Sequence, residues 1–228
     1  MGQQADLEWR DGEVPVSTRF DDPYFSLENG LAETGYVFLD GNALPARFRD
    51  GFHVAELGFG SGLNLLATLH LWRATGQAGR LCFTSFEAFP MAPDDMRRAH
   101  AAFTDLAPLA AELAPFWGQD RIALPDLDFT LVQGDARDTL PVWSGCADAW
   151  FLDGFSPAKN PELWDAALLA EVGRHTAPEG TAATYTAAGF VRRELEAAGF
   201  AVSRRPGFGR KRHMTQAVMA ATRQEHDR

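Results

Sequence analysis

The stretch Glu56-Leu57-Gly58-Phe59-Gly60-Ser61-Gly62 separates two apolar segments and decides the fold that the sequence predicts. Before it, Phe52 to Leu57 alternates bulky and small apolar residues, which is typical of a buried strand. After it, Leu63 to Trp72 is apolar on nearly every side, as in a helix packed on a sheet. Glycine has no Cβ atom, so the three glycines let the backbone turn sharply and approach a ligand closely. We therefore expect the first strand-to-helix turn of an α/β sheet, with a nucleotide-like cofactor bound on it.

The spacing of the glycines distinguishes between cofactors. A dinucleotide fingerprint has its third glycine three residues after the second, where this chain has Leu63. The pattern acid-x-Gly-x-Gly-x-Gly instead resembles the first motif of class I methyltransferases, which bind S-adenosylmethionine (SAM). For a glycine motif on its own, a tight structural turn without a ligand remains the alternative.

Length and composition indicate one globular domain with appendages. A chain of 228 residues, 46% of them hydrophobic, is long enough for one sizeable core. We expect an N-terminal extension over residues 1–50, a methyltransferase domain over residues 51–222 and a tail over residues 223–228. No run is as long as a membrane span or a signal core, which predicts a soluble, cytoplasmic protein. The cysteines and histidines have no metal-ligand spacing, so no metal site is expected.

The charge is unevenly distributed along the chain. The formal net charge is −10, but residues 192–212 contain seven basic and two acidic residues, a net charge of +5 against −15 for the remainder. Such an asymmetry favours a local site for a polyanion, although solvated helix and hairpin faces have similar compositions.

Two acidic residues follow predicted strands beside the glycine turn. The second strand, Leu81 to Phe86, ends in Glu87, whose two carboxylate oxygens can accept hydrogen bonds from both ribose hydroxyls of SAM. The third strand, Phe129 to Val132, is followed by Asp135 and Ala136. In SAM-dependent enzymes an acid at this point commonly reaches the adenine amino group. Asp135 is equally suited to be the N-cap of a short helix, and the two roles are compatible.

Asp153 is the candidate catalytic residue. It follows the fourth strand, Ala147 to Leu152, and begins the loop that runs to Pro161. Ligands of open α/β sheets lie at the carboxyl ends of the strands near the topological switch point, so this loop should face the transferable methyl group.

The remaining segments complete a Rossmann-like fold. A helix is expected from Asn160 to about His175, and another from Ala188 to Ala198. Three further strands are expected over about Gly180 to Tyr185, Phe200 to Arg204 and Met214 to Ala220, the last two joined by a basic loop. A terminal antiparallel hairpin after five αβ units is a feature of class I methyltransferases and gives a seven-stranded sheet of order 3-2-1-4-5-7-6.

The N-terminal extension is predicted to lie outside this sheet. Leu7 to Thr18 reads as a hairpin, with Asp11-Gly12 as its turn. Phe20 to Ser26 combines two neighbouring acids with three aromatic residues, so it forms either a lid over the cofactor or a packed cover. Its composition favours a cover.

Five segments together carry a more specific resemblance, to the methyltransferase module of the tRNA 5-methylaminomethyl-2-thiouridine biosynthesis proteins. It covers about residues 7 to 220. The segments are Asp21-Asp22-x-Tyr24-Phe25-Ser26, Gly58-Phe59-Gly60-Ser61-Gly62-Leu63-Asn64, Ser85-Phe86-Glu87, Trp150-Phe151-Leu152-Asp153-Gly154-Phe155-Ser156-Pro157-Ala158-Lys159-Asn160-Pro161 and Gly207-Phe208-Gly209-Arg210-Lys211-Arg212.

The resemblance implies a substrate, a cofactor and a partner. In that family the module uses SAM to methylate the 5-aminomethyl group of a wobble uridine in bacterial tRNA. It is often fused to a C-terminal FAD-dependent oxidoreductase, which is the expected partner here. The sequence ends at Arg228 without a segment for it. A stand-alone form and a piece of a fused protein both remain open.

The resemblance and the strand-end arguments together give two sets of site residues. The residues expected to bind the cofactor are Tyr24, Glu56, Gly58, Phe59, Gly60, Gly62, Asn64, Glu87, Asp135, Ala136 and Asp153. The residues expected to contact tRNA are Phe155, Lys159, Arg210, Lys211 and Arg212.

The resemblance implies an alkyl amine as the nucleophile, and its protonation state determines the role expected of Asp153. With a pKa near that of lysine, about 10.4, roughly one such amine in a few thousand is neutral at pH 7. We expect Asp153 to orient the amine first and to act as general base second, because a carboxylate also stabilises the ammonium form. Two other classes stay open, a SAM-dependent methyltransferase for a small-molecule or protein amine and a catalytically silent binding module.

Overall fold

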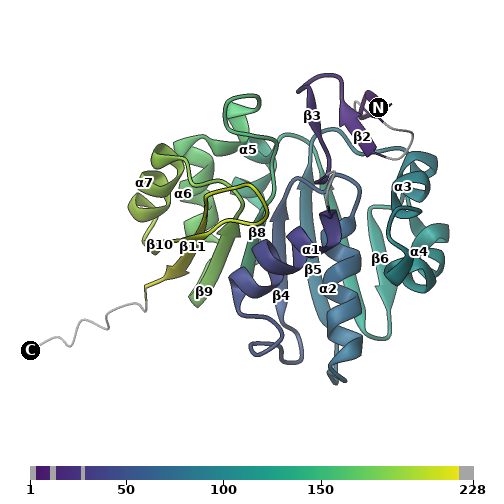
Figure 1. Cartoon of the computed structure of the whole chain (residues 1–228). Coiled ribbons are helices and arrows are strands. Elements are labelled where there is room, and N and C mark those ends of the chain that lie inside the picture. Colours follow the sequence, from purple (N-terminus) through teal and green to yellow (C-terminus); the bar gives the residue numbers. More distant parts are fainter. Residues whose placement is uncertain (1–3, 11–13, 27–28, 221–228) are drawn as a thin grey trace, which may run out of the picture.

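The computed structural model describes residues 4–10, 14–26 and 29–220, and an eight-stranded sheet runs through its centre (Figure 1). The strand order is β10-β11-β9-β8-β4-β5-β7-β6. Neighbours from β9 to β7 run parallel, whereas β6, β10 and β11 pair antiparallel. The strands are β4 (His53–Leu57), β5 (Leu81–Glu87), β6 (Arg121–Leu124), β7 (Leu127–Gln133), β8 (Ala147–Leu152), β9 (Thr176–Thr184), β10 (Phe200–Pro206) and β11 (His213–Met219).

The predicted count of seven strands is wrong, because β6 adds an eighth at one edge of the sheet. β6 forms a tight antiparallel hairpin with β7, in which Leu124 pairs with Leu127. Ile122 is the one fully buried side chain of β6, so the strand lacks the apolar run that identified the others. The remaining strands follow one another as β7-β5-β4-β8-β9-β11-β10, which is the expected order.

Helices cover both faces of the sheet (Figure 1). One apolar cluster joins α2, α3 and α4 to one face, and a second joins α5, α6 and α7 to the other. The helices are α1 (Gly30–Thr34), α2 (Leu63–Ala74), α3 (Pro93–His100), α4 (Ala107–Leu113), α5 (Ala136–Thr139), α6 (Ala166–Arg174) and α7 (Gly189–Ala197). None of these described helices is long and apolar enough to cross a membrane.

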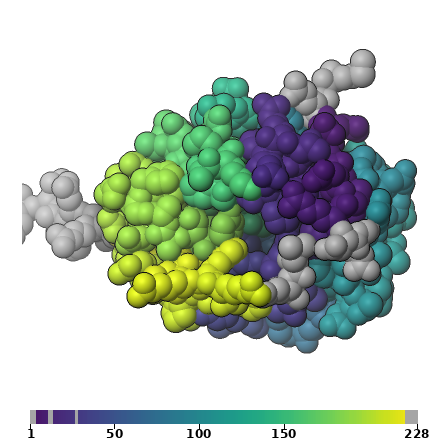
Figure 2. All heavy atoms as spheres, turned by 45° about the horizontal axis from the view of Figure 1, so that its top comes forward, coloured from purple at the N-terminus to yellow at the C-terminus, as the bar shows by residue number. Residues whose placement is uncertain are grey.

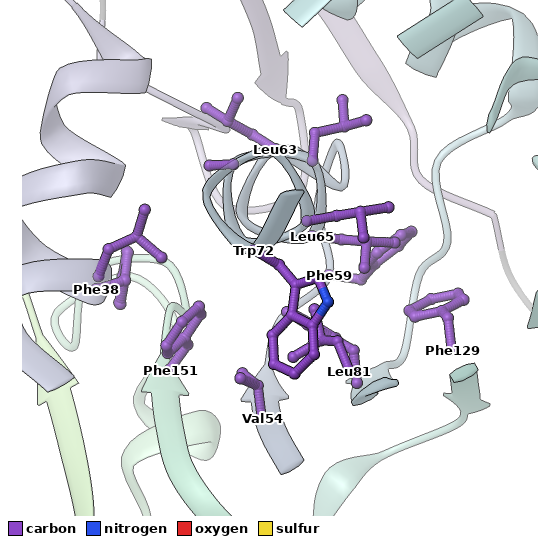
Figure 3. Packing of buried hydrophobic residues seen from close by; sticks show 14 of the residues in the cluster. Phe38, Val54, Phe59, Leu63, Leu65, Trp72, Leu81, Phe129 and Phe151 are labelled. Carbon is purple, nitrogen blue, oxygen red and sulfur yellow. The ribbon is translucent and has the colours of Figure 1, made fainter. Parts of the chain in front are cut away.

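The helix α2 is mostly apolar because residues 63–69 and Trp72 are buried. Leu65 and Trp72 project from it among sheet residues such as Val54, Leu81 and Phe151 (Figure 3). Its other side packs against α1 and the π-helical turn Gly35–Leu39 that follows α1. Its first two turns are therefore shielded from water on both sides, which agrees with their apolar sequence, whereas His70 near its end is exposed.

The N-terminal extension begins with a small sheet of its own. β1 (Leu7–Arg10) and β2 (Val14–Ser17) form the predicted hairpin, and β3 (Asp22–Pro23) adds a third antiparallel strand. The turn expected at residues 11–12 and the tail expected at residues 223–228 lie outside the described residues. The π-helical turn Gly35–Leu39 is also part of the extension, but its buried side chains pack in the same apolar cluster as the large sheet.

The start predicted for the helix from Asn160 to His175 is wrong. The structure has a 3-10 turn over Pro161–Trp164, and α6 begins afterwards at Ala166. The Asp165 carboxylate accepts a hydrogen bond from the backbone N–H of Ala167, so Asp165 is the N-cap of α6.

Candidate functional site

A cavity of about 1600 Å³ lies at the carboxyl ends of β4, β5, β7 and β8. Its walls come from the glycine turn, the loops after these strands, the segment Asp22 to Ser26, the helix α1 and the loop between β10 and β11. Figure 2 shows it as a hollow between the purple N-terminal residues and the yellow C-terminal hairpin. The chain therefore builds one cavity from segments nearly 200 residues apart in sequence.

Most of the sequence-predicted site residues line this cavity. They are Tyr24, Gly58, Phe59, Gly60, Asn64, Glu87, Asp135, Ala136, Asp153, Phe155, Lys159, Arg210 and Lys211. Three others do not line it. Glu56 is completely buried behind the cavity, Gly62 is the N-cap of α2 and lies against Phe59, and Arg212 is exposed.

The glycine turn brings two loops into close contact. Gly58 has φ +89°, and a Cβ atom there would lie 2.6 Å from the carbonyl oxygen of Asp153. Gly60 has φ +54°, and its Cβ would lie 3.2 Å from the ring of Tyr24. These positions are strained for any side chain, so glycine is needed to bring the turn close to both neighbours.

Glu87 is held by backbone amides of the glycine turn and of its own loop. One carboxylate oxygen accepts from the Gly60 N–H at 3.1 Å and the other from the Phe89 N–H at 2.8 Å. Burial raises the pKa of Glu87, and the surrounding N–H groups oppose that rise. The amides thus fix the orientation of a carboxylate that faces the cavity.

Asp135 is the N-cap of α5, as one of its two predicted roles required. Its Oδ1 accepts from the backbone N–H of Arg137 at 2.9 Å, and its Oδ2 accepts from the Arg137 guanidinium at 2.6 Å. These bonds lower the pKa of Asp135. Both oxygens are engaged, so an adenine amino group would have to share them.

Asn64 links the candidate catalytic residue to a buried carboxyl group. Its Nδ2 donates to Oδ2 of Asp153 at 2.7 Å and to Oε1 of Glu56 at 2.8 Å. The Thr34 hydroxyl donates to the Asn64 carbonyl oxygen at 3.0 Å, which fixes the orientation of the amide. The Ser85 hydroxyl donates to the second oxygen of Glu56 at 2.7 Å. These bonds lie inside the protein, which indicates that Glu56 and Asn64 position Asp153.

Asp153 titrates near neutral pH. Its carboxylate keeps some exposure to the cavity, but protein atoms surround its other sides. This burial raises the pKa of Asp153 to about 7, although the hydrogen bond from Asn64 acts in the opposite direction. Near neutral pH the carboxylate form, which can accept a proton, is therefore in equilibrium with the protonated form.

The segment Asp22 to Ser26 packs onto the loop that follows β8. The Asp22 carboxylate accepts from the backbone N–H of Ser156 at 2.9 Å, and the Tyr24 and Phe155 rings make an edge contact at 5.1 Å. The Lys159 ammonium donates to the Asp21 carbonyl and lies 3.4 Å from the Asp22 carboxylate. Lys159, predicted to contact tRNA, is thus paired with the cover in this structure.

Sequence reasoning missed two residues at the cavity wall, Glu33 of α1 and Tyr185 after β9. The ammonium of Lys211, also predicted to contact tRNA, lies 2.6 Å from the Glu33 carboxylate and 4.1 Å from the centre of the Tyr185 ring. Tyr185 follows a strand in the same way as Asp153 does. The rule that ligands lie at the carboxyl ends of the strands, called the strand-end rule below, could therefore have identified it. Nothing in the sequence indicates that Glu33 meets a loop 178 residues later.

Comparison with known proteins agrees with this fold. A family model described as S-adenosyl-L-methionine-dependent methyltransferase matches residues 105–220. The tRNA 5-methylaminomethyl-2-thiouridine biosynthesis bifunctional proteins MnmC of Hahella chejuensis and Caulobacter sp. K31 are 48% and 49% identical to this chain. The matches cover 95% and 93% of it but 37% and 38% of those proteins. The crystal structure of MNMC2 from Aquifex aeolicus matches with a TM-score of 0.75 and 27% identity, over 96% of this chain and 72% of that one.

Proposed function

The chain belongs to the family of S-adenosyl-L-methionine-dependent methyltransferases, and on this premise we propose that it methylates the 5-aminomethyl group of a wobble uridine in tRNA. The observation that carries the proposal is a single cavity that contains both the glycine turn and Asp153. The chain spans a little over a third of the length of its bifunctional relatives. An FAD-dependent oxidoreductase acting in the same pathway is therefore part of the proposal.

The residues of the cavity fit SAM. Gly58 and Gly60 line the cavity without side chains, so the backbone of the turn can approach a ligand closely, and the Glu87 carboxylate is oriented toward the cavity by two amides. We propose that the glycine turn and Glu87 hold the nucleoside part, with the Tyr24 ring beside Gly60. When bound, SAM supplies an electrophilic methyl group. The protein must then align the amine and keep it neutral.

Asp153 is suited to both tasks in the proposed reaction. Its carboxylate is anchored through Asn64 and faces the cavity, so it can orient an amine by a charge-assisted hydrogen bond. With a pKa of about 7, Asp153 can also accept the proton that the ammonium nitrogen loses. The amine's high pKa costs roughly 4 to 5 kcal/mol at pH 7, and an acceptor with a pKa near 7 takes the proton without removing that cost.

Methyl transfer from labelled SAM tests the proposal directly. Transcribed tRNA, the same tRNA bearing the aminomethyl group and a set of small or peptide amines are offered in parallel. We expect transfer to the aminomethyl tRNA alone. Transfer to a small or peptide amine would support the alternative, a methyltransferase for such amines. SAM binding without any transfer would identify a silent binding module.

Replacing Glu87 tests the proposed contact with the ribose. Glu87→Ala removes the acceptor and leaves the Gly60 and Phe89 N–H groups unpaired. We expect the free energy of SAM binding, measured by calorimetry, to weaken by roughly 1 to 3 kcal/mol. Asp138→Ala, an exposed acid in α5, serves as the control and should leave SAM affinity unchanged. An unchanged dissociation constant for Glu87→Ala would remove Glu87 from the site.

The basic loop between β10 and β11 is the proposed contact for tRNA phosphates. Arg210 and Arg212 are exposed on it, and Arg210 lines the cavity as well. Each phosphate contact releases counterions, so affinity falls with salt on a log-log slope of roughly −0.7 to −0.9 per contact. Neutralising both arginines to Gln should therefore flatten the slope by about 1.4 to 1.8 and leave SAM affinity intact.

A matched pair of arginines controls for net charge in that experiment. Arg80 directly precedes β5, and Arg174 ends α6 shortly before β9 begins. Both therefore lie near the amino ends of the strands, opposite the cavity. Changing these two to Gln alters the net charge equally, and the salt slope should stay as in the wild type. If the Arg210 and Arg212 variant has the wild-type slope too, the loop is a solvated hairpin tip.

A further inference from the structure

A lysine ammonium occupies one end of the cavity. The Nζ atom of Lys211 lies 2.6 Å from Oε1 of Glu33 and 4.1 Å from the centre of the Tyr185 ring. All three residues line the cavity. The Glu33 side chain is only 13% exposed, whereas that of Lys211 is 45% exposed. A mostly buried carboxylate and an aromatic face thus hold a cation that reaches them from an exposed loop.

The aromatic wall of this position is rigidly held beside Asp153. The Tyr185 hydroxyl donates to the carbonyl oxygen of Gly154 at 2.7 Å, directly after Asp153 in the chain. The other ring neighbour is Trp164, in edge contact at 6.4 Å between centroids. The hydroxyl is therefore committed to the backbone, and the face of the ring that the Lys211 ammonium covers can hold a cation.

The position is close enough to Asp153 to act on it electrostatically. Glu33 raises the pKa of Asp153, and Lys211 lowers it, after the larger effects of burial and of Asn64. The pKa of Tyr185 is raised mainly by burial and also by Asp153 and Glu33. A cation that moved from Glu33 toward Asp153 would stay inside the same negatively charged end of the cavity.

We propose that Glu33 and the face of Tyr185 form the subsite that receives the alkylammonium group of the substrate, and that Lys211 occupies this subsite when substrate is absent. The inference rests on the proposed function, because it requires a substrate with a primary amine. That amine is almost entirely protonated at pH 7, so it needs an anionic partner on arrival. Glu33 supplies this partner, and Asp153 then accepts one proton from the nitrogen.

Lysine is suited to such a temporary role. Its ammonium is a compact charge on a flexible stem, and its chemistry matches that of the aminomethyl group that would replace it. In the loop, Lys211 stands between Arg210 and Arg212, which remain the proposed phosphate contacts. Binding of tRNA phosphates to those arginines would draw the loop toward the nucleic acid and leave Glu33 to the incoming amine.

The test compares the affinity of two tRNAs in the absence of SAM. One bears the 5-aminomethyl group and the other is the same tRNA with unmodified uridine, and their dissociation constants are measured by filter binding. The dissociation constant of the unmodified tRNA divided by that of the aminomethyl tRNA isolates the contribution of the amine. We expect Glu33→Gln to reduce this ratio roughly 10- to 100-fold, as for the loss of one charge-assisted pair, with unchanged affinity for unmodified tRNA. The control is Asp40→Asn, an exposed acid in the following 3-10 turn, which should leave the ratio unchanged.

Lys211→Met separates this role from a phosphate contact. Methionine keeps much of the stem but removes the charge, so Glu33 would be left for the substrate. We expect the aminomethyl tRNA to bind more tightly relative to the unmodified tRNA. If Lys211 binds phosphate instead, both tRNAs weaken equally and the ratio stays constant.

The outcomes also separate this inference from the proposed function. A wild-type protein that transfers no methyl group to aminomethyl tRNA and binds both tRNAs equally would overturn both. If the wild type methylates this tRNA but Glu33→Gln preserves the ratio, the proposed function stands and the subsite does not exist. Calorimetry of SAM binding checks that Glu33→Gln retains a folded site.

Discussion

Asp153→Asn is expected to lower the turnover number by roughly 10²- to 10⁴-fold, while the dissociation constant for SAM stays within about threefold of the wild type. Asparagine keeps the shape and one oxygen that can accept from Asn64, but it can neither carry the charge nor take a proton. Single-turnover methyl transfer to aminomethyl tRNA, with calorimetry of SAM binding, measures the two quantities separately. Near wild-type turnover of the variant between pH 6 and 9 would make Asp153 a structural residue.

The pH dependence of the wild type gives a second measure of the same role. Burial raises the pKa of Asp153 to about 7, so the residue is mostly protonated below that pH and mostly ionised above it. Only the ionised form accepts a proton, and kcat/KM reports the pKa of the free enzyme. We therefore expect kcat/KM to rise about tenfold per pH unit below pH 7 on account of this group and to level off above it. In Asp153→Asn this step should be absent.

Much of the fold could be predicted because its central elements are buried on both faces. Strands such as His53–Leu57 and Ala147–Leu152 are mostly apolar and contain no glycine or proline, and α2 is mostly apolar for the same reason. The edge strand β6 has one fully buried side chain and gave no such signal. The start of α6 was misjudged because both Asn160 and Asp165 are acceptable cap residues, and only Asp165 makes a side-chain cap bond.

The strand-end rule explains why part of the site could be predicted as well. Glu87 ends a strand of the parallel sheet, Asp135 and Asp153 follow two others, and all three line the cavity. Glu56 was expected to contact the cofactor, yet it is completely buried. Side chains alternate along β4, so Glu56 shares a face with Val54 and points toward α2 rather than toward the cavity.

The rest of the site depends on contacts between segments far apart in the chain. Glu33 meets Lys211 across 178 residues, and Thr34 orients Asn64 across 30 residues. Neither pair shares a helix, a strand or a motif, so no local pattern connects them. The sequence supplied the acids at the strand ends, but the three-dimensional structure alone identifies which side chains orient them.

Gly58→Ala is expected to lower stability strongly, because Gly58 combines a strained backbone with a close contact to another backbone atom. A residue other than glycine in a left-handed conformation costs roughly 1 to 2 kcal/mol. At φ +89° the new Cβ would also lie 2.6 Å from the carbonyl oxygen of Asp153, and such overpacking costs a further ~1 to 3 kcal/mol. We expect the free energy of unfolding in urea to fall by about 2 to 5 kcal/mol in total.

Gly76 provides the matched control for that variant. It has φ +64°, but a Cβ atom there would meet nothing within 4 Å. Gly76→Ala should therefore lose only the backbone component, roughly 1 to 2 kcal/mol. The difference between the two variants in the free energy of unfolding measures the contact between Gly58 and Asp153. The backbone bond from the Asp153 N–H to the Leu57 carbonyl oxygen joins the two loops next to Gly58, so a displacement at Gly58 also moves Asp153. If the two variants lose equal stability and both keep wild-type turnover, the close approach of the glycine turn to Asp153 has no energetic role.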